Sequence, residues 1–407
     1  MSAGAGWCLL LVLVKLGDAA TVGVYALGIA IAGPVSVLTN LGLTGALVTE
    51  TRAGCPYGAY VALRLLSTVL SIFIISCIAI CAGYPSASRW VIVLIGVSVA
   101  FTSIREIFLS IMRRYECMNL SGRSQMVTAV LCLVAFAATF WATRSLAWAV
   151  GALCVVRSCI LLLLDVPVAR RLVQQFDQAG ISPIWSPRML WGVGWESAPL
   201  AAAMTLTSLI SNIPRYVLEA RAGTEALGHF SALASLVIAG TLVSSSLGTA
   251  VTPRLALYFV KNRRAYLGLV ARLLLMGGVI GLTGVAGAAI FGRPILRIVF
   301  KPEYAAFDRE FVLITVHLAI MLLVSFVNQA LVASRAFDRV FWVNLAVCGT
   351  SLVFSFWLID GSGIMGACLA WVLAPVCWLV ALSLTLVWRV RTAPVTVPED
   401  AKAGMHP

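Results

Sequence analysis

The sequence predicts an all-α integral membrane protein of about twelve transmembrane helices in two parallel six-helix bundles, with a short first helix. The first observation is composition: 61% of the 407 residues are hydrophobic and 11% are charged, whereas a soluble domain is roughly half apolar and a quarter charged. The second is a series of apolar runs near the roughly 20 residues that a spanning helix needs. The third is a pattern that occurs twice, about half a chain apart.

Eleven apolar runs are long enough to cross the hydrocarbon core of a bilayer. In chain order they are 26–48, 59–82, 90–112, 125–141, 146–166, 191–213, 227–251, 266–290, 311–334, 341–359 and 366–388. A twelfth run, Trp7–Leu16, is apolar but too short to cross alone. No basic residue precedes it and Lys15 lies inside it, which is not typical of a secretory signal. We therefore expect a shortened first helix rather than a cleaved signal.

The distribution of basic residues predicts the orientation of the chain. The formal net charge is +13. When the loops are assigned alternately to two sides, one side collects about twice as many Lys and Arg residues as the other, Arg113, Arg114, Arg170 and Arg171 among them. Because basic loops stay in the cytoplasm, we expect both termini to be cytoplasmic, which requires an even number of spans. The positive charge therefore reflects topology and indicates no nucleic-acid partner.

The repeated pattern predicts a duplication. Its copies are GDAATVGVYALGIAIAGPVSVLTNLG at Gly17–Gly42 and GTEALGHFSALASLVIAGTLVSSSLG at Gly223–Gly248, and each contains Gly-x-aromatic before an apolar stretch that closes on Leu-Gly. The copies enter the second and eighth spans, so the chain reads as six helices plus six in the same orientation. We expect an N-terminal lobe at 1–167, a cytoplasmic linker at 168–189, a C-terminal lobe at 190–390 and a cytoplasmic tail at 391–407.

Short motifs occur in a recognisable combination along nearly the whole chain. They are Asn212-Ile213-Pro214-Arg215-Tyr216, Leu227–Ala234, Thr252–Ala256, Tyr57-Gly58-Ala59-Tyr60 with Leu63–Leu66, Lys301–Ala305 and Gly363–Ala367. Together they resemble the polysaccharide and lipopolysaccharide biosynthesis membrane proteins. These are oligosaccharide flippases in the superfamily that also holds the multidrug and toxin extruders and the lipid II flippases. Thr44 stands where many relatives carry an arginine, so no cationic role is carried over to it.

The resemblance implies a two-lobed fold like that of the multidrug and toxin extruders and a transport function. Such proteins move a polyprenyl-diphosphate-linked oligosaccharide, such as an O-antigen or exopolysaccharide repeat unit, across the bacterial inner membrane. The implied partners are the lipid-linked oligosaccharide, membrane lipid, a polysaccharide polymerase and chain-length machinery. The resemblance implies no catalytic residue, cofactor or metal. A cleft that carries the polar head group while the prenyl tail stays in lipid needs only rocking of the lobes.

Arginines inside the spans are the candidate contacts for a diphosphate, because an ionisable group in a span is costly and marks function, and because arginine grips phosphate oxygens bidentately. The candidates are Arg157, Arg64, Arg105, Arg215 and Arg272. Arg157 is the principal one, since it lies about two turns from either end of its span. Arg64 and Arg272 are near enough to the cytoplasmic face to snorkel. Arg105 can instead neutralise Glu106 or another partner, and Arg215 can cap a helix.

Acidic residues in the spans are weaker candidates for coupling to protons or sodium. Glu196 and Asp165 are these candidates, and both are expected near the interface, where water reaches them. His317 is the histidine expected inside the membrane. The eleven cysteines lie singly, without Cys-x-x-Cys or histidine clusters, so we expect packing residues and no metal site.

Two other functions stay open at this point. A multidrug extruder shares the architecture but more often shows acidic residues deep in its spans, whereas the embedded charges here are mostly arginine. A membrane-embedded polysaccharide polymerase or glycosyltransferase would show a sizeable outer loop with clustered charges, or a carboxylate pair. The longest expected outer loop, 291–310, is short, so a non-enzymatic transporter is favoured.

Overall fold

A computed structural model of the chain describes residues 2–44, 47, 57–176, 180–334 and 337–392, without the side chains of some helical residues, Glu196 among them. The chain forms two compact units, Met1–Ala232 and Leu233–Pro407. Within the described residues the regular structure is entirely helical.

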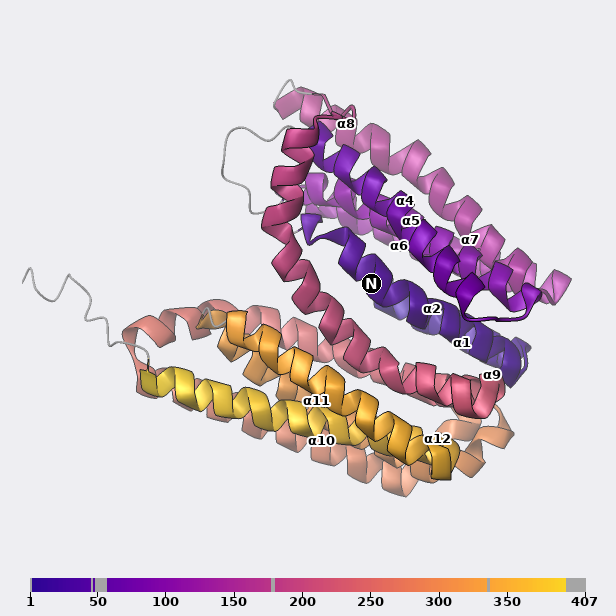
Figure 1. Cartoon of the computed structure of the whole chain (residues 1–407), viewed down its shortest axis with the longest axis vertical. Helices are drawn as coiled ribbons and strands as arrows, with labels where there is room; N and C mark the ends of the chain where they lie inside the picture. The colour runs from indigo at the N-terminus through magenta and orange to yellow at the C-terminus, as the bar shows by residue number, and fades with distance from the viewer. Residues whose placement is uncertain (1, 45–46, 48–56, 177–179, 335–336, 393–407) are drawn as a thin grey trace, which may run out of the picture. The chain divides into compact units, whose positions relative to one another are not determined.

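The first unit contains helices that lie side by side (Figure 1). They are α1 (Ser2–Leu16), α2 (Ala19–Asn40), α4 (Tyr57–Cys81), α5 (Ser86–Arg114), α6 (Met118–Thr143), α7 (Leu146–Ile160), the π-helix η1 (Leu161–Asp165) and α8 (Val166–Phe176). Helix α1 has 15 residues, which at 1.5 Å per residue is about 22 Å, against a hydrocarbon core of about 30 Å. The predicted short first helix is confirmed.

The second unit contains α10 (Arg263–Val299), the 3₁₀ helix η2 (Pro302–Phe307), α11 (Asp308–Ala333) and α12 (Phe337–Thr392). Helix α11 packs against both α10 and α12 (Figure 1). Helix α10 starts where the sequence supplies an N-cap: the side chain of Asn262 accepts a hydrogen bond of 3.0 Å from the backbone N–H of Ala265.

Two long helical segments are each broken by a glycine. Helix α9 (Pro187–Lys261) runs from the first unit into the second and is broken at Gly223, where φ is 82°. Helix α12 is broken at Gly363, where φ is 54°. Positive φ is the region that glycine adopts without the steric penalty of a Cβ. With these breaks the described chain has about twelve helices, as the sequence predicts.

The second predicted span, 26–48, was placed too late along the chain. Helix α2 begins at Ala19 and ends at Asn40, because Leu41 and Gly42 both adopt left-handed backbone conformations, with φ of 51° and 61°. A residue in this conformation is a common helix terminator. The apolar run continues past this turn, so hydropathy alone misses the end of the helix.

The helix that begins at Leu146 extends farther than predicted. It continues from α7 through η1 and α8 to Phe176, past the expected end of the span at 166 and into the expected linker. Helix α9 overlaps the C-terminal end of the expected linker, 168–189, since it begins at Pro187. The lobe and linker boundaries stay predictions.

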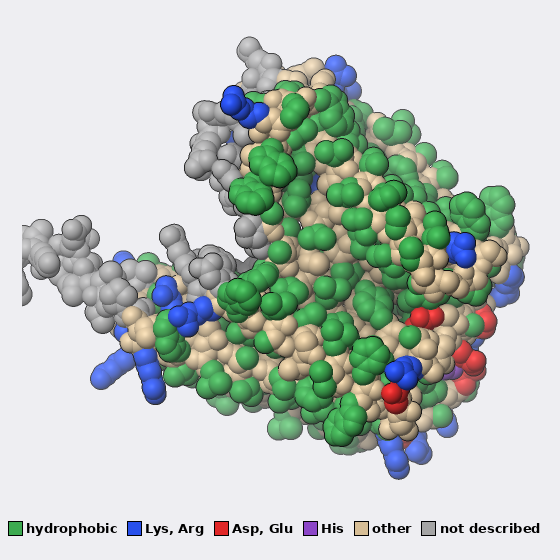
Figure 2. Space-filling model, viewed as in Figure 1, with side chains coloured by type: hydrophobic (Ala, Val, Ile, Leu, Met, Phe, Trp, Pro, Cys, Tyr) green, Lys and Arg blue, Asp and Glu red, His purple; other side chains and the backbone are tan. Residues whose placement is uncertain are grey.

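The described surface suits a lipid environment. Eight helices are long and apolar enough to cross a membrane. Figure 2 shows hydrophobic side chains spread over the visible helix faces. Phe73, Leu163 and Trp357 are among the large hydrophobic side chains that are more than 60% exposed. Exposed Trp90, Trp141 and Trp148 lie near helix ends, where tryptophan anchors helices at the membrane interface.

Candidate functional site

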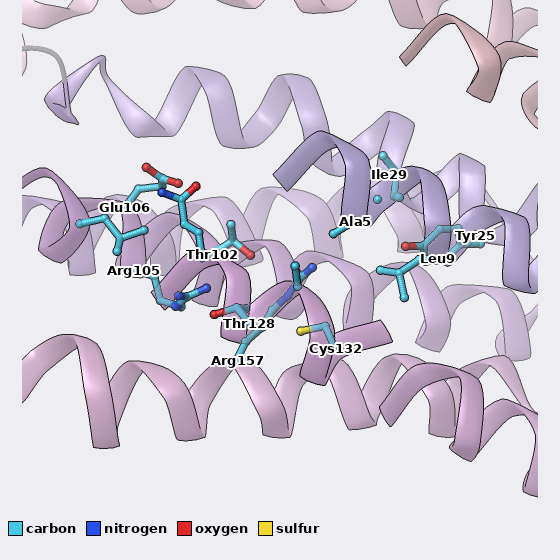
Figure 3. A pocket seen from close by; sticks show the side chains of 14 residues that line it. Ala5, Leu9, Tyr25, Ile29, Thr102, Arg105, Glu106, Thr128, Cys132 and Arg157 are labelled. Carbon is cyan, nitrogen blue, oxygen red and sulfur yellow. The ribbon is translucent and has the colours of Figure 1, made fainter. Parts of the chain in front are cut away.

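A partly open cavity of about 160 Å³ lies inside the first unit. Five helices contribute to its wall (Figure 3). The lining residues are Ala5, Gly6 and Leu9 of α1, Tyr25 and Ile29 of α2, Thr102, Arg105, Glu106 and Leu109 of α5, Gln125, Thr128, Ala129 and Cys132 of α6, and Arg157 of α7. Two of the five predicted arginines, Arg105 and Arg157, are therefore brought together at one cavity, although they are far apart in the sequence.

Arg105 is held in a buried ion pair. Its Nε lies 2.6 Å from a carboxylate oxygen of Asp165, and its Nη2 donates a hydrogen bond of 2.9 Å to the Ser124 hydroxyl. That hydroxyl in turn donates to the other carboxylate oxygen of Asp165. Arg105 is 5% exposed and Asp165 is fully buried. The charge of Arg105 is thus largely neutralised by the protein itself.

Asp165 owes its place to an irregular stretch of helix. It is the last residue of η1, the five-residue π-helix that follows α7. A π-helical turn inserts one extra residue and turns the following side chains to a new face, and such turns are frequent at functional sites. In this protein the turn ends on the carboxylate that reaches Arg105 and Ser124.

Arg157 has neutral partners instead. Its Nη1 lies 2.8 Å from the backbone carbonyl oxygen of Ser98 and 2.8 Å from the Ser98 hydroxyl. The residue is partly buried and lines the cavity. Among the described residues no carboxylate forms an ion pair with it. Its positive charge is oriented by hydrogen bonds but is not neutralised.

The third charged residue of the cavity wall, Glu106, has a cation of its own. Its carboxylate lies 3.5 Å from Nη1 of Arg113, and both side chains are about one third exposed. With Arg105 paired to Asp165 and Glu106 paired to Arg113, Arg157 carries the uncompensated charge among the described lining residues. The cavity therefore favours an anion.

The chemistry of the wall suits a small, highly charged oxyanion. Arginine is permanently charged and presents a planar fork of donors that matches phosphate oxygens. The hydroxyls of Thr102 and Thr128 at the wall donate to the backbone carbonyls of Ser98 and Ser124 in their own helices, so the guanidinium is the donor to the anion. The volume equals that of roughly five water molecules at about 30 Å³ each. That space accepts a phosphate-sized group.

The other three predicted arginines do not line this cavity. Arg64 is 1% exposed in α4 and donates from Nη1 to the side-chain oxygen of Asn40 at the end of α2. Arg215 donates a hydrogen bond of 2.8 Å to the side chain of Asn212, one turn earlier in α9. Arg272 is exposed on α10 in the second unit. Their contact with substrate stays a prediction.

The acidic and histidine candidates have varied surroundings. Asp165 is fully buried, so the expectation that water reaches it was wrong; the helix continues past it, and Arg105 covers it. The side chain of Glu196 lies outside the description. In the second unit His317 stacks on Trp371, with ring centroids 4.0 Å apart, and its Nδ1 contacts the backbone oxygen of Trp371. The described residues contain no cluster of potential metal ligands.

Sequence reasoning missed two residues of the site. Ser98, which orients Arg157, and Ser124, which bridges Arg105 and Asp165, are single small polar residues in apolar helices. Such residues are common in membrane helices, so nothing in their spacing marked them. The available signal was a polar residue at the same membrane depth as a charged residue in a neighbouring span. That signal can be used only when it is known which spans are neighbours.

Comparisons with known proteins agree with this architecture. A family model described as "Polysaccharide biosynthesis protein" matches residues 4–259. A capsular polysaccharide biosynthesis protein, CapF of Staphylococcus aureus, is 24% identical over 383 residues, with 91% of each chain covered.

Solved structures of low identity share the fold. A multidrug resistance MATE family transporter in an inward-facing conformation matches with a TM-score of 0.73 at 10% identity, covering 96% of both chains. The lipid II flippase MurJ, in an inward closed conformation, matches with a TM-score of 0.70 at 11% identity, covering 96% of this chain and 87% of the other. The chain is therefore an all-helical, multi-pass membrane protein with a MATE-like fold, as the sequence predicts.

Proposed function

The chain belongs to the polysaccharide biosynthesis protein family, and we propose that it carries a polyprenyl-diphosphate-linked oligosaccharide across the bacterial inner membrane by alternating access. The cargo is an O-antigen or exopolysaccharide repeat unit. Its diphosphate and sugars are too polar to cross hydrocarbon, whereas its prenyl chain is stable in lipid. A carrier for such a molecule has to shelter the polar head and needs no catalytic step.

The observation that carries this proposal is the uncompensated charge of Arg157 at the cavity of the first unit. A diphosphate is the most concentrated charge on the cargo, and a phosphate-sized cavity with a guanidinium that no described carboxylate neutralises is suited to it. Part of the diphosphate enters this cavity in our proposal, and the sugars and the prenyl chain stay outside it. Arg105 is a second cation at the same wall, and its charge is paired with Asp165.

The names of similar proteins support the same class of cargo. One solved relative is named a lipid II flippase, and the curated relative is named for capsular polysaccharide biosynthesis. A lipid-linked cargo with a sugar head satisfies both names. We further propose that both termini are cytoplasmic, on the distribution of basic residues, and that a polysaccharide polymerase and chain-length machinery act beside the protein.

Two other functions are less favoured by the cavity. An extruder of cationic drugs needs carboxylates facing its substrate, whereas the two described carboxylates at or beside this wall, Glu106 and Asp165, are paired with Arg113 and Arg105. A membrane-embedded polymerase or glycosyltransferase that activates sugars with two carboxylates lacks that pair here for the same reason.

The test is transport in cells that carry variants of Arg157. Lipid-linked sugar that reaches the outer leaflet is measured in a strain lacking the native gene, together with the amount of variant protein in the membrane. Arg157→Ala should abolish transport while the protein still inserts. Unchanged transport in Arg157→Ala would contradict the proposal.

A further inference from the structure

Helices α2 and α9 meet backbone to backbone at two glycines in the first unit. A Cβ placed on Gly23 would overlap the carbonyl group of Thr224, with its carbon 2.7 Å away, and would lie 3.2 Å from the backbone nitrogen of Gly228. A Cβ placed on Gly228 would overlap the carbonyl group of Ala19 in the same way, again with the carbon at 2.7 Å. Only glycine allows so close an approach at these positions.

The contact is reciprocal. Gly23 faces the residue four positions before Gly228, and Gly228 faces the residue four positions before Gly23. These are the glycines of the repeated Gly-x-aromatic pattern, so the two copies of the repeat touch each other through the same element of the pattern. Self-complementary contact of this kind arises where a two-fold axis passes between two like surfaces.

Further contacts join α9 to α2 and to the connection between α4 and α5. The Tyr84 hydroxyl, in the connection between α4 and α5, donates a hydrogen bond of 3.4 Å to the carboxylate of Glu219 in α9. Burial and the neighbouring carboxylate raise the pKa of Tyr84 to about 12, so the hydroxyl keeps its proton at physiological pH. The Tyr216 hydroxyl donates to the backbone oxygen of Ala30 in α2. The approach of Ala19 to Gly228 places the start of α2 beside the bend of α9 at Gly223.

We propose that the crossing of α2 and α9 at Gly23 and Gly228 is a gate. It closes the path through the protein to the outer side of the membrane, and its two helices separate when cargo leaves. The inference rests on the proposed function and orientation. Two flat glycine surfaces can separate and meet again without disentangling side chains. Opening also breaks the bond of Tyr84 to Glu219, which is long for an O–H donor, and the bond of Tyr216 to the Ala30 carbonyl. Alternating access requires such a contact on the closed side.

The test uses substitutions that prevent α2 and α9 from closing at this crossing, and it measures access from outside the cell. In a background without native cysteines, a reporter Ala19→Cys is treated with a membrane-impermeant maleimide added outside intact cells. Gly23→Ala puts a methyl group against the Thr224 carbonyl, so labelling of the reporter should rise several-fold. Because the contact is reciprocal, Gly228→Ala should raise it by a similar factor.

Gly28→Ala is the matched control, since Gly28 lies five residues later on α2 and its new methyl group meets the flexible end of Ile95 within the N-terminal helices. It should leave labelling near that of the parent. Tyr84→Phe adds no bulk and removes the bond to Glu219, so it keeps the test decisive if the glycine variants do not fold. It should raise labelling by a smaller factor.

Unchanged labelling in Gly23→Ala and Gly228→Ala, or an equal rise in Gly28→Ala, would overturn the gate and leave a packing contact. If the glycine variants do not fold, unchanged labelling in Tyr84→Phe would overturn it. Labelling reports the opening of the contact and not the cargo. If labelling rises while the parent protein moves no lipid-linked sugar, the gate stands and the proposed cargo falls.

Discussion

Arg105 and Arg157 lie at one cavity on neighbouring helices, yet the protein treats them differently. Arg105 is 5% exposed and pairs with a fully buried carboxylate, Asp165, at 2.6 Å. Arg157 is only partly buried and rests on the carbonyl and the hydroxyl of Ser98 at 2.8 Å each. The same side chain therefore stands in a neutral pair on α5 and as a net positive charge on α7.

Arg105 holds the helices together, whereas Arg157 is available to a ligand. A buried pair compensates the cost of removing two charges from water, so taking away one partner strands the other. A guanidinium on neutral acceptors keeps most of its attraction for an anion, and its orientation is fixed in advance. We therefore assign Arg105 mainly to stability and Arg157 mainly to binding.

The largest effect should come from breaking the pair. Asp165→Ala leaves Arg105 buried without its counter-charge, so the free energy of unfolding should fall by about 3–5 kcal/mol. Thermal or denaturant unfolding of the purified protein measures this. Asp308→Ala removes an ion pair of 2.8 Å with Arg293, which is 69% exposed, and should cost under about 1 kcal/mol. Equal losses in the two variants would mean that the buried pair of Arg105 contributes no more to stability than an exposed pair.

A substitution that keeps the charge of Arg157 tests whether binding needs the guanidinium fork or only a positive charge. Arg157→Lys retains a cation but loses the bidentate grip on phosphate oxygens. Loss of one charge-assisted hydrogen bond costs about 1.5–3 kcal/mol, so transport should fall about tenfold or more without being abolished. Folding stability should change little. A variant as active as the parent would show that charge alone suffices and that the fork geometry is unused.

Ser98→Ala tests whether Arg157 is oriented in advance. The substitution removes the hydroxyl acceptor but leaves the Ser98 carbonyl bond. The hydroxyl is one of two acceptors that orient the guanidinium, and the remaining carbonyl bond still holds it, so anion affinity should fall by less than the roughly tenfold loss expected for Arg157→Lys. Ser110→Ala is the control, because the Ser110 hydroxyl bonds the carbonyl of Glu106 in its own helix. Equal losses in both would argue for a general effect on α5.

The smallest effect should come from Glu106. Its pair with Arg113 is 3.5 Å long and about one third exposed, so Glu106→Gln should change the free energy of unfolding by under about 1 kcal/mol. Removing a negative charge from the cavity wall should strengthen anion binding, and the gain should shrink with added salt. Weaker binding in this variant would mean that Glu106 itself contacts the ligand.

The general architecture could be predicted from the sequence, whereas the pairing at the site could not. Hydropathy and the repeat were enough for about twelve helices and a short α1, and an arginine deep in a span singled out Arg157. The helix end at Leu41 and the π-helix before Asp165 are backbone events inside apolar runs, which hydropathy does not register. Asp165 lies 60 positions from Arg105, so only the packing of α5 against η1 shows that they are partners.

The most direct measurement is the binding of inorganic diphosphate to the purified protein, compared across three forms: the parent, Arg157→Ala and Arg171→Ala. Arg171 is an exposed arginine on α8, so its loss lowers the net charge by the same amount without touching the cavity. We expect Arg157→Ala to weaken binding by about tenfold or more, as for a lost charge-assisted contact, and Arg171→Ala to bind like the parent. Equal binding in the parent and Arg157→Ala would contradict the assignment of the cavity as the diphosphate site.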